Sequence, residues 1–350
     1  MKAAVYRGNR RMEVEDVDLP VLNADEFLLD VSACTICGSD LHAYVQDWYP
    51  LGAIMGHEYS GYVSAVGADV TEVVVGEPLA IIQAVPCGEC RDCIAGRTNL
   101  CIRSARRGGG YAEQVVLNER CVHFRVPEGM AMDTAALLEP VSVAVRAVNR
   151  AGLNISEPVV VIGLGSIGQS IVQILKARGV STIIAVDLSP KRLELAARAG
   201  ARPVNPADGD VAEQVQEIVG TSSHRGETSS EATTVFECSG SPRVVDDTVG
   251  RIIRKGGTIV MVALFESPVT FDPNPIVRKE VNLLGSFGYV EQDWTQAFEL
   301  LSSGAIDAEA LISQRVPLSQ INEAFAIQLD KSASMKVAVI PDARLSRSSS

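Results

Sequence analysis

The most constraining feature of this 350-residue chain is the hexapeptide Gly163-Leu164-Gly165-Ser166-Ile167-Gly168, which has the form G-x-G-x-x-G. It follows the apolar run Val159–Ile162, which predicts a buried strand, and it opens a segment with helical apolar spacing. The first glycine permits a tight turn, the second lets a pyrophosphate approach, and the third lets helix and strand pack closely. We therefore predict a dinucleotide site with phosphates at a helix N-terminus. The alternative is a glycine-rich turn in an α/β domain that binds no nucleotide.

The pattern of predicted elements changes near Pro158 and indicates two domains in an α/β chain. After it, strands alternate with helices, which is typical of a Rossmann fold with a doubly wound parallel sheet. The predicted strands there are 182–186, 234–238, 258–262 and 281–284, with a helix from Ser189-Pro190 to Gly200. The first 140 residues predict a β-rich domain with strands at 3–6, 27–31, 62–66 and 112–116. We also expect helices at 135–148 and 294–302 and a polar surface loop at 221–231.

Asp187 stands at the end of the second strand of the Rossmann pattern, about twenty residues beyond the glycines. A carboxylate there holds the adenosine ribose hydroxyls and repels a 2′-phosphate. This favours NAD over NADP. Lys191 and Arg192 weaken that preference, because either side chain could reach toward a phosphate.

Four of the eight cysteines fall in one short stretch, as Cys87, Cys90, Cys93 and Cys101. Four thiolates can close a tetrahedral zinc shell and leave no position for a substrate, so we predict a structural zinc. An iron–sulfur cluster is the alternative that spacing alone leaves open. Four free thiols are disfavoured, because clustered exposed cysteines oxidise readily.

A second group of donors lies in Cys37-Gly38-Ser39-Asp40-Leu41-His42 and Gly56-His57-Glu58. The thiolate of Cys37, the imidazole of His57 and the carboxylate of Glu58 would leave a fourth zinc position open, as catalysis requires. Asp40 could orient the free nitrogen of His57. Cys34 forms a Cys-x-x-Cys pair with Cys37, which suggests either a redox pair or a packed strand residue.

Composition limits the partners. There are 43 acidic and 31 basic residues, and the net charge of -12 disfavours nucleic acid and anionic membranes. No apolar run reaches the roughly 18 residues of a spanning helix, and the start of the chain lacks a signal-peptide core. We expect a cytoplasmic protein that acts on a small molecule.

These motifs, in this order, resemble the zinc-containing medium-chain alcohol dehydrogenase family, with Leu138-Glu139-Pro140 standing between the cysteine loop and the glycine fingerprint. The resemblance covers nearly the whole chain. It implies a GroES-like β-rich catalytic domain over residues 1–144, a coenzyme domain over 145–286 and a return to the first domain over 287–350. Glu58 and Glu139 point to the sorbitol, polyol and threonine dehydrogenase branch.

The resemblance also implies roles for single residues. Cys37, His57 and Glu58 would bind a catalytic zinc, and Glu139 would be a fourth, exchangeable ligand. Ser39 would take the substrate hydroxyl proton, and the coenzyme ribose would pass it to His42. The chain would then carry one catalytic and one structural zinc and assemble as a homodimer or homotetramer.

The resulting expectation is an NAD-linked oxidoreductase that interconverts a secondary alcohol (a polyol, cyclitol or diol) and its ketone by hydride transfer. One alternative is an L-threonine 3-dehydrogenase-type enzyme for amino alcohols, although no counter-charge for a substrate carboxylate is evident. A zinc-free quinone or enone reductase is disfavoured by the complete ligand set. A non-catalytic nucleotide-binding sensor is disfavoured because nothing is missing from the catalytic set.

Overall fold

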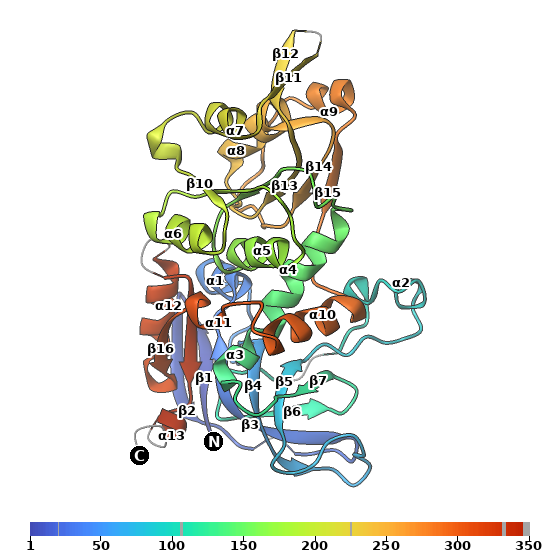
Figure 1. Cartoon of the computed structure of the whole chain (residues 1–350). Coiled ribbons are helices and arrows are strands. Elements are labelled where there is room, and N and C mark those ends of the chain that lie inside the picture. The colour runs from blue at the N-terminus through green and yellow to red at the C-terminus, as the bar shows by residue number, and fades with distance from the viewer. Residues whose placement is uncertain (20, 106–107, 225, 331–333, 346–350) are drawn as a thin grey trace. The chain divides into compact units, whose positions relative to one another are not determined.

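The computed structural model describes residues 1–19, 21–105, 108–224, 226–330 and 334–345. They form two compact units, which we treat separately. Unit 1 comprises Met1–Pro140 and Ala297–Ser350, and unit 2 comprises Val141–Gln296. Both chain termini therefore belong to unit 1 (Figure 1). Within the described residues, no helix is long and apolar enough to cross a bilayer.

Unit 1 is built on a seven-stranded sheet of described residues whose order is β16-β17-β3-β4-β5-β7, with β6 paired to β3. The long central strand β3 (Glu26–Thr35) pairs antiparallel with β4, β6 and β17. The other strands of this sheet are β4 (Glu58–Val66), β5 (Pro78–Ile82), β6 (Gln114–Asn118), β7 (Val122–Arg125), β16 (Ile312–Pro317) and β17 (Lys336–Ile340). Two strands from the C-terminal segment thus complete a sheet that begins near the N-terminus.

The sheet of unit 1 surrounds an apolar core with buried Phe27, Tyr59, Tyr111 and Phe325. A separate hairpin of β1 (Lys2–Gly8) and β2 (Arg11–Asp16) also supplies buried residues to this core. The short helical segments of unit 1 are α1 (Gly38–Gln46), α2 (Arg91–Ile94), η1 (Thr98–Leu100), α3 (Met132–Ala136), α11 (Ala308–Leu311), η4 (Leu318–Gln320), α12 (Ile321–Leu329) and α13 (Asp342–Leu345).

Unit 2 contains the predicted parallel sheet, with the order β10-β9-β8-β13-β14-β15. Its strands are β8 (Val159–Ile162), β9 (Ile183–Val186), β10 (Arg202–Val204), β13 (Ala232–Glu237), β14 (Ile253–Met261) and β15 (Asn282–Gly285). The chain order reverses between β8 and β13, so the carboxyl ends of these two strands mark the switch point where α/β folds bind ligands. The Rossmann prediction is confirmed.

Helices cover this sheet, and α5 and α6 pack on strands β8, β9 and β10. The helical segments of unit 2 are α5 (Ser166–Ala177), α6 (Pro190–Arg198), η2 (Pro206–Asp208), α7 (Val211–Val219), α8 (Pro242–Asp247), the π-helical turn η3 (Thr248–Ile252) and α9 (Asn274–Lys279). The unit boundaries fall within α4 (Leu138–Arg150) and α10 (Glu291–Ser302).

Two predictions about local structure were wrong. The polar stretch expected to be a loop forms the hairpin of β11 (Thr221–His224) and β12 (Glu227–Ser230), which projects at the top of Figure 1. Each strand of this hairpin is held by backbone hydrogen bonds to the other strand. It therefore forms without the alternating apolar residues that mark a strand with one buried face. The helix predicted over 135–148 is two helices, α3 and α4, because Pro140 lacks the N–H that would bond to Ala136.

Candidate functional site

The glycine turn of unit 2 has the geometry that its sequence predicts. Gly163 directly follows β8 with a φ of 88°, and a side chain there would meet Ser239 at 2.6 Å. A Cβ on Gly168 would lie 1.9 Å from the carbonyl oxygen of Gly163, which explains the close approach of helix and strand. A Cβ on Gly165 would meet nothing within 4 Å. Gly165, the glycine expected to face a phosphate, therefore borders open space. Ser166 and Ile167 follow it in the first turn of α5.

Asp187 is held against this turn. Its Oδ2 accepts a hydrogen bond from the Leu164 N–H at 2.7 Å, and its Oδ1 accepts one from the Ser189 N–H at 2.8 Å. Arg192 Nη1 lies 3.7 Å from the same Oδ2. The structure thus brings together the glycine turn, the acid and the arginine that were singled out along 30 residues of sequence.

Glu237 is a residue of this region that the sequence reasoning missed. It ends β13 at the switch point and is fully buried. Its carboxylate accepts hydrogen bonds from the Ser239 N–H at 2.9 Å and the Gly240 N–H at 3.1 Å. Burial raises its pKa despite these bonds. An acid immediately after a run of buried strand residues was the available signal.

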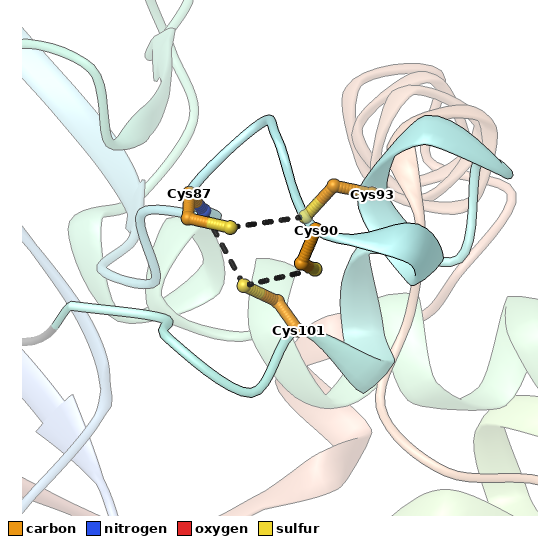
Figure 2. A group of neighbouring side chains, drawn as sticks. All are labelled: Cys87, Cys90, Cys93 and Cys101. Atoms are coloured by element: carbon orange, nitrogen blue, oxygen red, sulfur yellow. Dashed lines mark hydrogen bonds between the residues drawn. The ribbon is translucent and has the colours of Figure 1, made fainter.

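The four cysteines of the short loop in unit 1 converge on one point (Figure 2). The sulfurs of Cys87 and Cys93 lie 3.9 Å apart, and those of Cys90 and Cys101 lie 4.0 Å apart. A tetrahedron of zinc–sulfur bonds has sulfur–sulfur edges of about 3.8 Å, so the donors fit this ion. None of these cysteines forms a disulfide.

The loop shifts the pKa values of its cysteines in opposite directions. Backbone N–H groups, that of Glu89 first, outweigh desolvation and lower the pKa of Cys87 to about 6. Desolvation and the neighbouring sulfurs instead raise the pKa of Cys93 to about 12. The cluster therefore shares negative charge unevenly, and a divalent cation would stabilise the fully ionised form.

The second donor cluster begins at the N-terminus of α1. Cys37 is the N-cap, and its sulfur accepts from the Ser39 N–H at 3.4 Å and the Ser39 hydroxyl at 3.2 Å. The Asp40 carboxylate accepts from the Cys37 N–H at 3.2 Å, which completes a capping box. The sulfur of Cys37 and the carboxylate of Asp40 are thereby fixed at the first turn of α1.

His57 and Glu58 come to this sulfur from the start of β4. One donor atom from each of Cys37, His57 and Glu58 lies within 4.8 Å of the others, so together they could hold a metal ion. Asp40 Oδ1 lies 3.3 Å from His57 Nδ1, as expected for an orienting carboxylate. Burial disfavours the charged ring, but Asp40 and Cys37 outweigh it and raise the pKa of His57 well above its ordinary value.

Glu58 has a partner that sequence reasoning did not find. Lys336, at the start of β17, donates to both carboxylate oxygens of Glu58 at 2.8 Å. Both side chains are buried, and the hydroxyl of Thr35 also donates to Glu58. Burial lowers the pKa of Lys336, but Glu58 and Cys37 outweigh it and raise that pKa. No short-range sequence pattern predicts this contact, because 278 positions separate Lys336 from Glu58.

The remaining predicted residues are placed around this cluster. Glu139 is buried in the first turn of α4, and its charge contributes to the raised pKa of Lys336, but its carboxylate is not among the three converging donors. Ser39 and His42 lie on successive turns of α1, and the His42 ring stacks on Trp48. Cys34 is fully buried in β3 and forms no disulfide, so it is a packed strand residue.

Comparison with known proteins gives matches over both units. Residues 23–128 match the family described as alcohol dehydrogenase GroES-like domain, and residues 166–303 match the family described as zinc-binding dehydrogenase. The chain is 32% identical to sorbitol dehydrogenase of Bacillus subtilis over 98% of both chains. It is 31% identical to L-threonine 3-dehydrogenase of Bacillus licheniformis, over 97% of this chain and 99% of that protein.

Solved structures of other dehydrogenases have the same fold. A candidate zinc-binding dehydrogenase of Sinorhizobium meliloti, bound to NADP, is 29% identical with a TM-score of 0.86. An alcohol dehydrogenase of Escherichia coli, complexed with NADH, is 26% identical with a TM-score of 0.86. Each covers 97% of this chain and 99% of its own.

Proposed function

Because this chain belongs to the zinc-containing medium-chain alcohol dehydrogenase family, we propose that it interconverts a secondary alcohol and its ketone with NAD. The observation that carries the proposal is the convergence of one sulfur, one nitrogen and one oxygen donor at Cys37, His57 and Glu58. Three donors leave a position for substrate, whereas the four sulfurs of the other cluster do not. The chain would thus carry one catalytic and one structural zinc ion.

Cys37 and His57 would hold the catalytic zinc permanently. Glu58 would share its charge between the ion and Lys336, which donates to both of its oxygens. Glu139 would serve as a further, exchangeable ligand. When bound, the zinc would supply Lewis acidity and the nicotinamide coenzyme would supply the redox chemistry.

Residues of α1 would accept and release the proton of the substrate hydroxyl. Ser39 is exposed at the first turn of α1 and would accept the proton of the substrate hydroxyl. His42, one turn later and partly exposed, would receive this proton and release it to solvent. Asp40 would keep Nδ1 of His57 engaged, so that Nε2 faces the ion.

The coenzyme site favours NAD. Asp187 would bind the adenosine ribose, and its carboxylate would repel a 2′-phosphate. Arg192 lies 3.7 Å from this carboxylate and would be the residue to meet a 2′-phosphate. The related structures hold NADP in one case and NADH in the other. Asp187→Ser should lower kcat/KM for NAD by about tenfold or more and leave NADP use equal or improved. A variant that prefers NAD as strongly as the wild type would refute this role.

The substrate class is a polyol, cyclitol or diol, which the similarity to a sorbitol dehydrogenase supports. The comparable similarity to a threonine dehydrogenase supports an amino alcohol as the second candidate. We also propose a cytoplasmic homodimer or homotetramer, which light scattering would test.

The deciding experiment combines metal analysis with a substrate panel. The wild-type chain should hold two zinc ions and reduce NAD with at least one polyol, cyclitol or diol. Turnover of L-threonine alone would favour the second candidate. Two bound zinc ions without turnover of any secondary alcohol, with either coenzyme, would overturn the proposed activity.

A further inference from the structure

The carboxylate of Asp40 has a donor that the proposed mechanism does not use. Asp40 is fully buried, and its Oδ2 accepts a hydrogen bond from the hydroxyl of Tyr111 at 2.8 Å. The same oxygen accepts from the Cys37 N–H at 3.2 Å, while Oδ1 faces His57 Nδ1 at 3.3 Å. One carboxylate therefore accepts hydrogen bonds from the backbone of the sulfur ligand and from a tyrosine, and lies at ion-pair distance from the imidazole ligand.

Tyr111 is fixed to the segment that precedes His57. The Tyr111 N–H donates to the Met55 carbonyl at 3.0 Å, and the Gly110 N–H donates to the Gly56 carbonyl at 2.9 Å. Gly56 has a φ of 92°, and a Cβ on it would lie 3.0 Å from the Tyr111 nitrogen. The two segments are therefore in direct backbone contact immediately before the imidazole ligand.

The tyrosine ring has no freedom to point elsewhere. It is fully buried and packs edge-on against Phe325, with ring centroids 5.6 Å apart and planes at 80°. Its hydroxyl also lies 3.4 Å from the Thr35 carbonyl oxygen, so its strong acceptor is the Asp40 carboxylate. A buried carboxylate that loses one of its donors is less well stabilised and less firmly oriented.

We propose that Tyr111 is a positioning residue for the catalytic metal site, acting through Asp40 on the orientation of His57. The proposal rests on the proposed zinc at Cys37 and His57. With Tyr111 in place, Asp40 holds Nδ1 of His57 and leaves Nε2 directed at the ion. Without the hydroxyl, the carboxylate relaxes and the imidazole ligand is held less well.

The same helix supplies a matched control. The hydroxyl of Tyr6 donates to the carboxylate of Asp47, the C-cap of α1, and Tyr6 is also fully buried. Tyr111 and Tyr6 thus form tyrosine–aspartate bonds at the two ends of α1, but only one of these bonds adjoins the metal ligands. Y111F and Y6F each remove one hydroxyl and keep the ring.

The test uses the full chain and measures zinc affinity at the Cys37–His57–Glu58 cluster by competition with a chromophoric chelator. The ligand-field spectrum of the cobalt-substituted protein is recorded as a second measurement. Orienting partners of metal-bound histidines are worth roughly 10–100-fold in affinity, and Tyr111 acts one step further out, so Y111F should bind zinc about 3- to 10-fold more weakly. Its cobalt bands should shift. Y6F should match the wild type in both measurements.

A double-mutant cycle separates this role from a general loss of stability. If Tyr111 acts through Asp40, Y111F should change zinc affinity little in a D40N background. Wild-type affinity and an unchanged cobalt spectrum in Y111F, or an equal loss in Y6F, would overturn the proposal. A wild-type chain that binds zinc at the four cysteines alone would overturn both this proposal and the proposed catalytic site. A wild type with two zinc ions and an unaffected Y111F would overturn this proposal alone.

Discussion

The two donor clusters of unit 1 are assembled in opposite ways. The four cysteines lie within 15 consecutive residues, and their loop contains α2 and η1, neither of which buries a side chain. The second cluster joins Cys37, the N-cap of α1, to His57 and Glu58 at the start of β4, and Lys336 reaches it from a strand near the C-terminus. A loop without a core depends on its ion for shape, whereas a cluster inside a folded sheet is shaped before the ion binds.

The sharpest test of this difference is removal of His57. Because the surrounding sheet holds the remaining ligands, His57→Ala should fold and bind NAD. It should lose about a thousandfold in kcat/KM, which corresponds to roughly 4 kcal/mol of transition-state stabilisation. Steady-state kinetics and NAD fluorescence titration would measure both effects. His123→Ala, on β7 outside the cluster, is the control; retention of full activity by His57→Ala would refute the catalytic assignment.

Cys93→Ala should have the reverse effect, because α2 and η1 of this loop bury no side chain and the ion is the main interaction expected to order it. One zinc should be lost, and trypsin should cleave at Arg91 or Arg97 at least about tenfold faster. Cys121→Ala removes a buried thiol that belongs to neither cluster and should leave both zinc ions and protease resistance unchanged. A Cys93→Ala protein that stays protected and keeps two zinc ions would show that the loop does not need the metal.

Lys336→Met tests whether the second cluster is preformed. Loss of one partner of a buried ion pair costs about 3–5 kcal/mol, and the metal-free protein should lose that amount in urea unfolding. Zinc should recover part of the loss, because it can neutralise Glu58 in place of the lysine. Lys279→Met is the control, since Lys279 is a buried lysine that donates to backbone carbonyls such as that of Val249. If Lys336→Met lowered the free energy of unfolding equally with and without zinc, Glu58 would not be shared between the lysine and the ion.

The pKa of His57 predicts opposite pH trends for metal-free stability and zinc affinity. The folded pKa is raised above the ordinary value of 6.5, so the charged ring stabilises the metal-free fold below that value. This contribution is lost as the pH rises through the folded pKa. Zinc needs the neutral ring, so affinity at this site should increase by up to about tenfold per pH unit over the same rise. Unfolding and chelator titrations at several pH values would measure both, and a flat zinc affinity would contradict the protonated ring.

The smallest expected effect concerns the surface of the cysteine loop. Arg97 Nη2 lies 2.7 Å from Asp92 Oδ1, and the arginine side chain is 45% exposed. Arg97→Ala should therefore cost less than about 1 kcal/mol, and high salt should reduce the effect. Thermal unfolding of the zinc-loaded protein would show it. A loss as large as that of Cys93→Ala would mean that the ion pair, rather than the metal, orders the loop.

Local sequence was enough for the parts of the molecule whose interactions are local. The glycine turn was predicted from a strand, three glycines and a helix in direct succession, and the four cysteines from their spacing. Local sequence was not enough for the β11–β12 hairpin, whose strands are held by backbone pairing and carry no apolar pattern. It was also not enough at Pro140, where one proline divides a helical run into two helices.

The amino-acid sequence by itself determined the parallel coenzyme fold, the four-sulfur loop and the identity of the three mixed donors, since each is written in neighbouring residues or in a regular period. Only the tertiary structure decided that Tyr111 reaches Asp40 and that Lys336 reaches Glu58. The physical reason is strand pairing. The segment around Tyr111 pairs with Met55 and Gly56, and β17 pairs with β3, so partners far apart in the chain meet only once the sheet has formed.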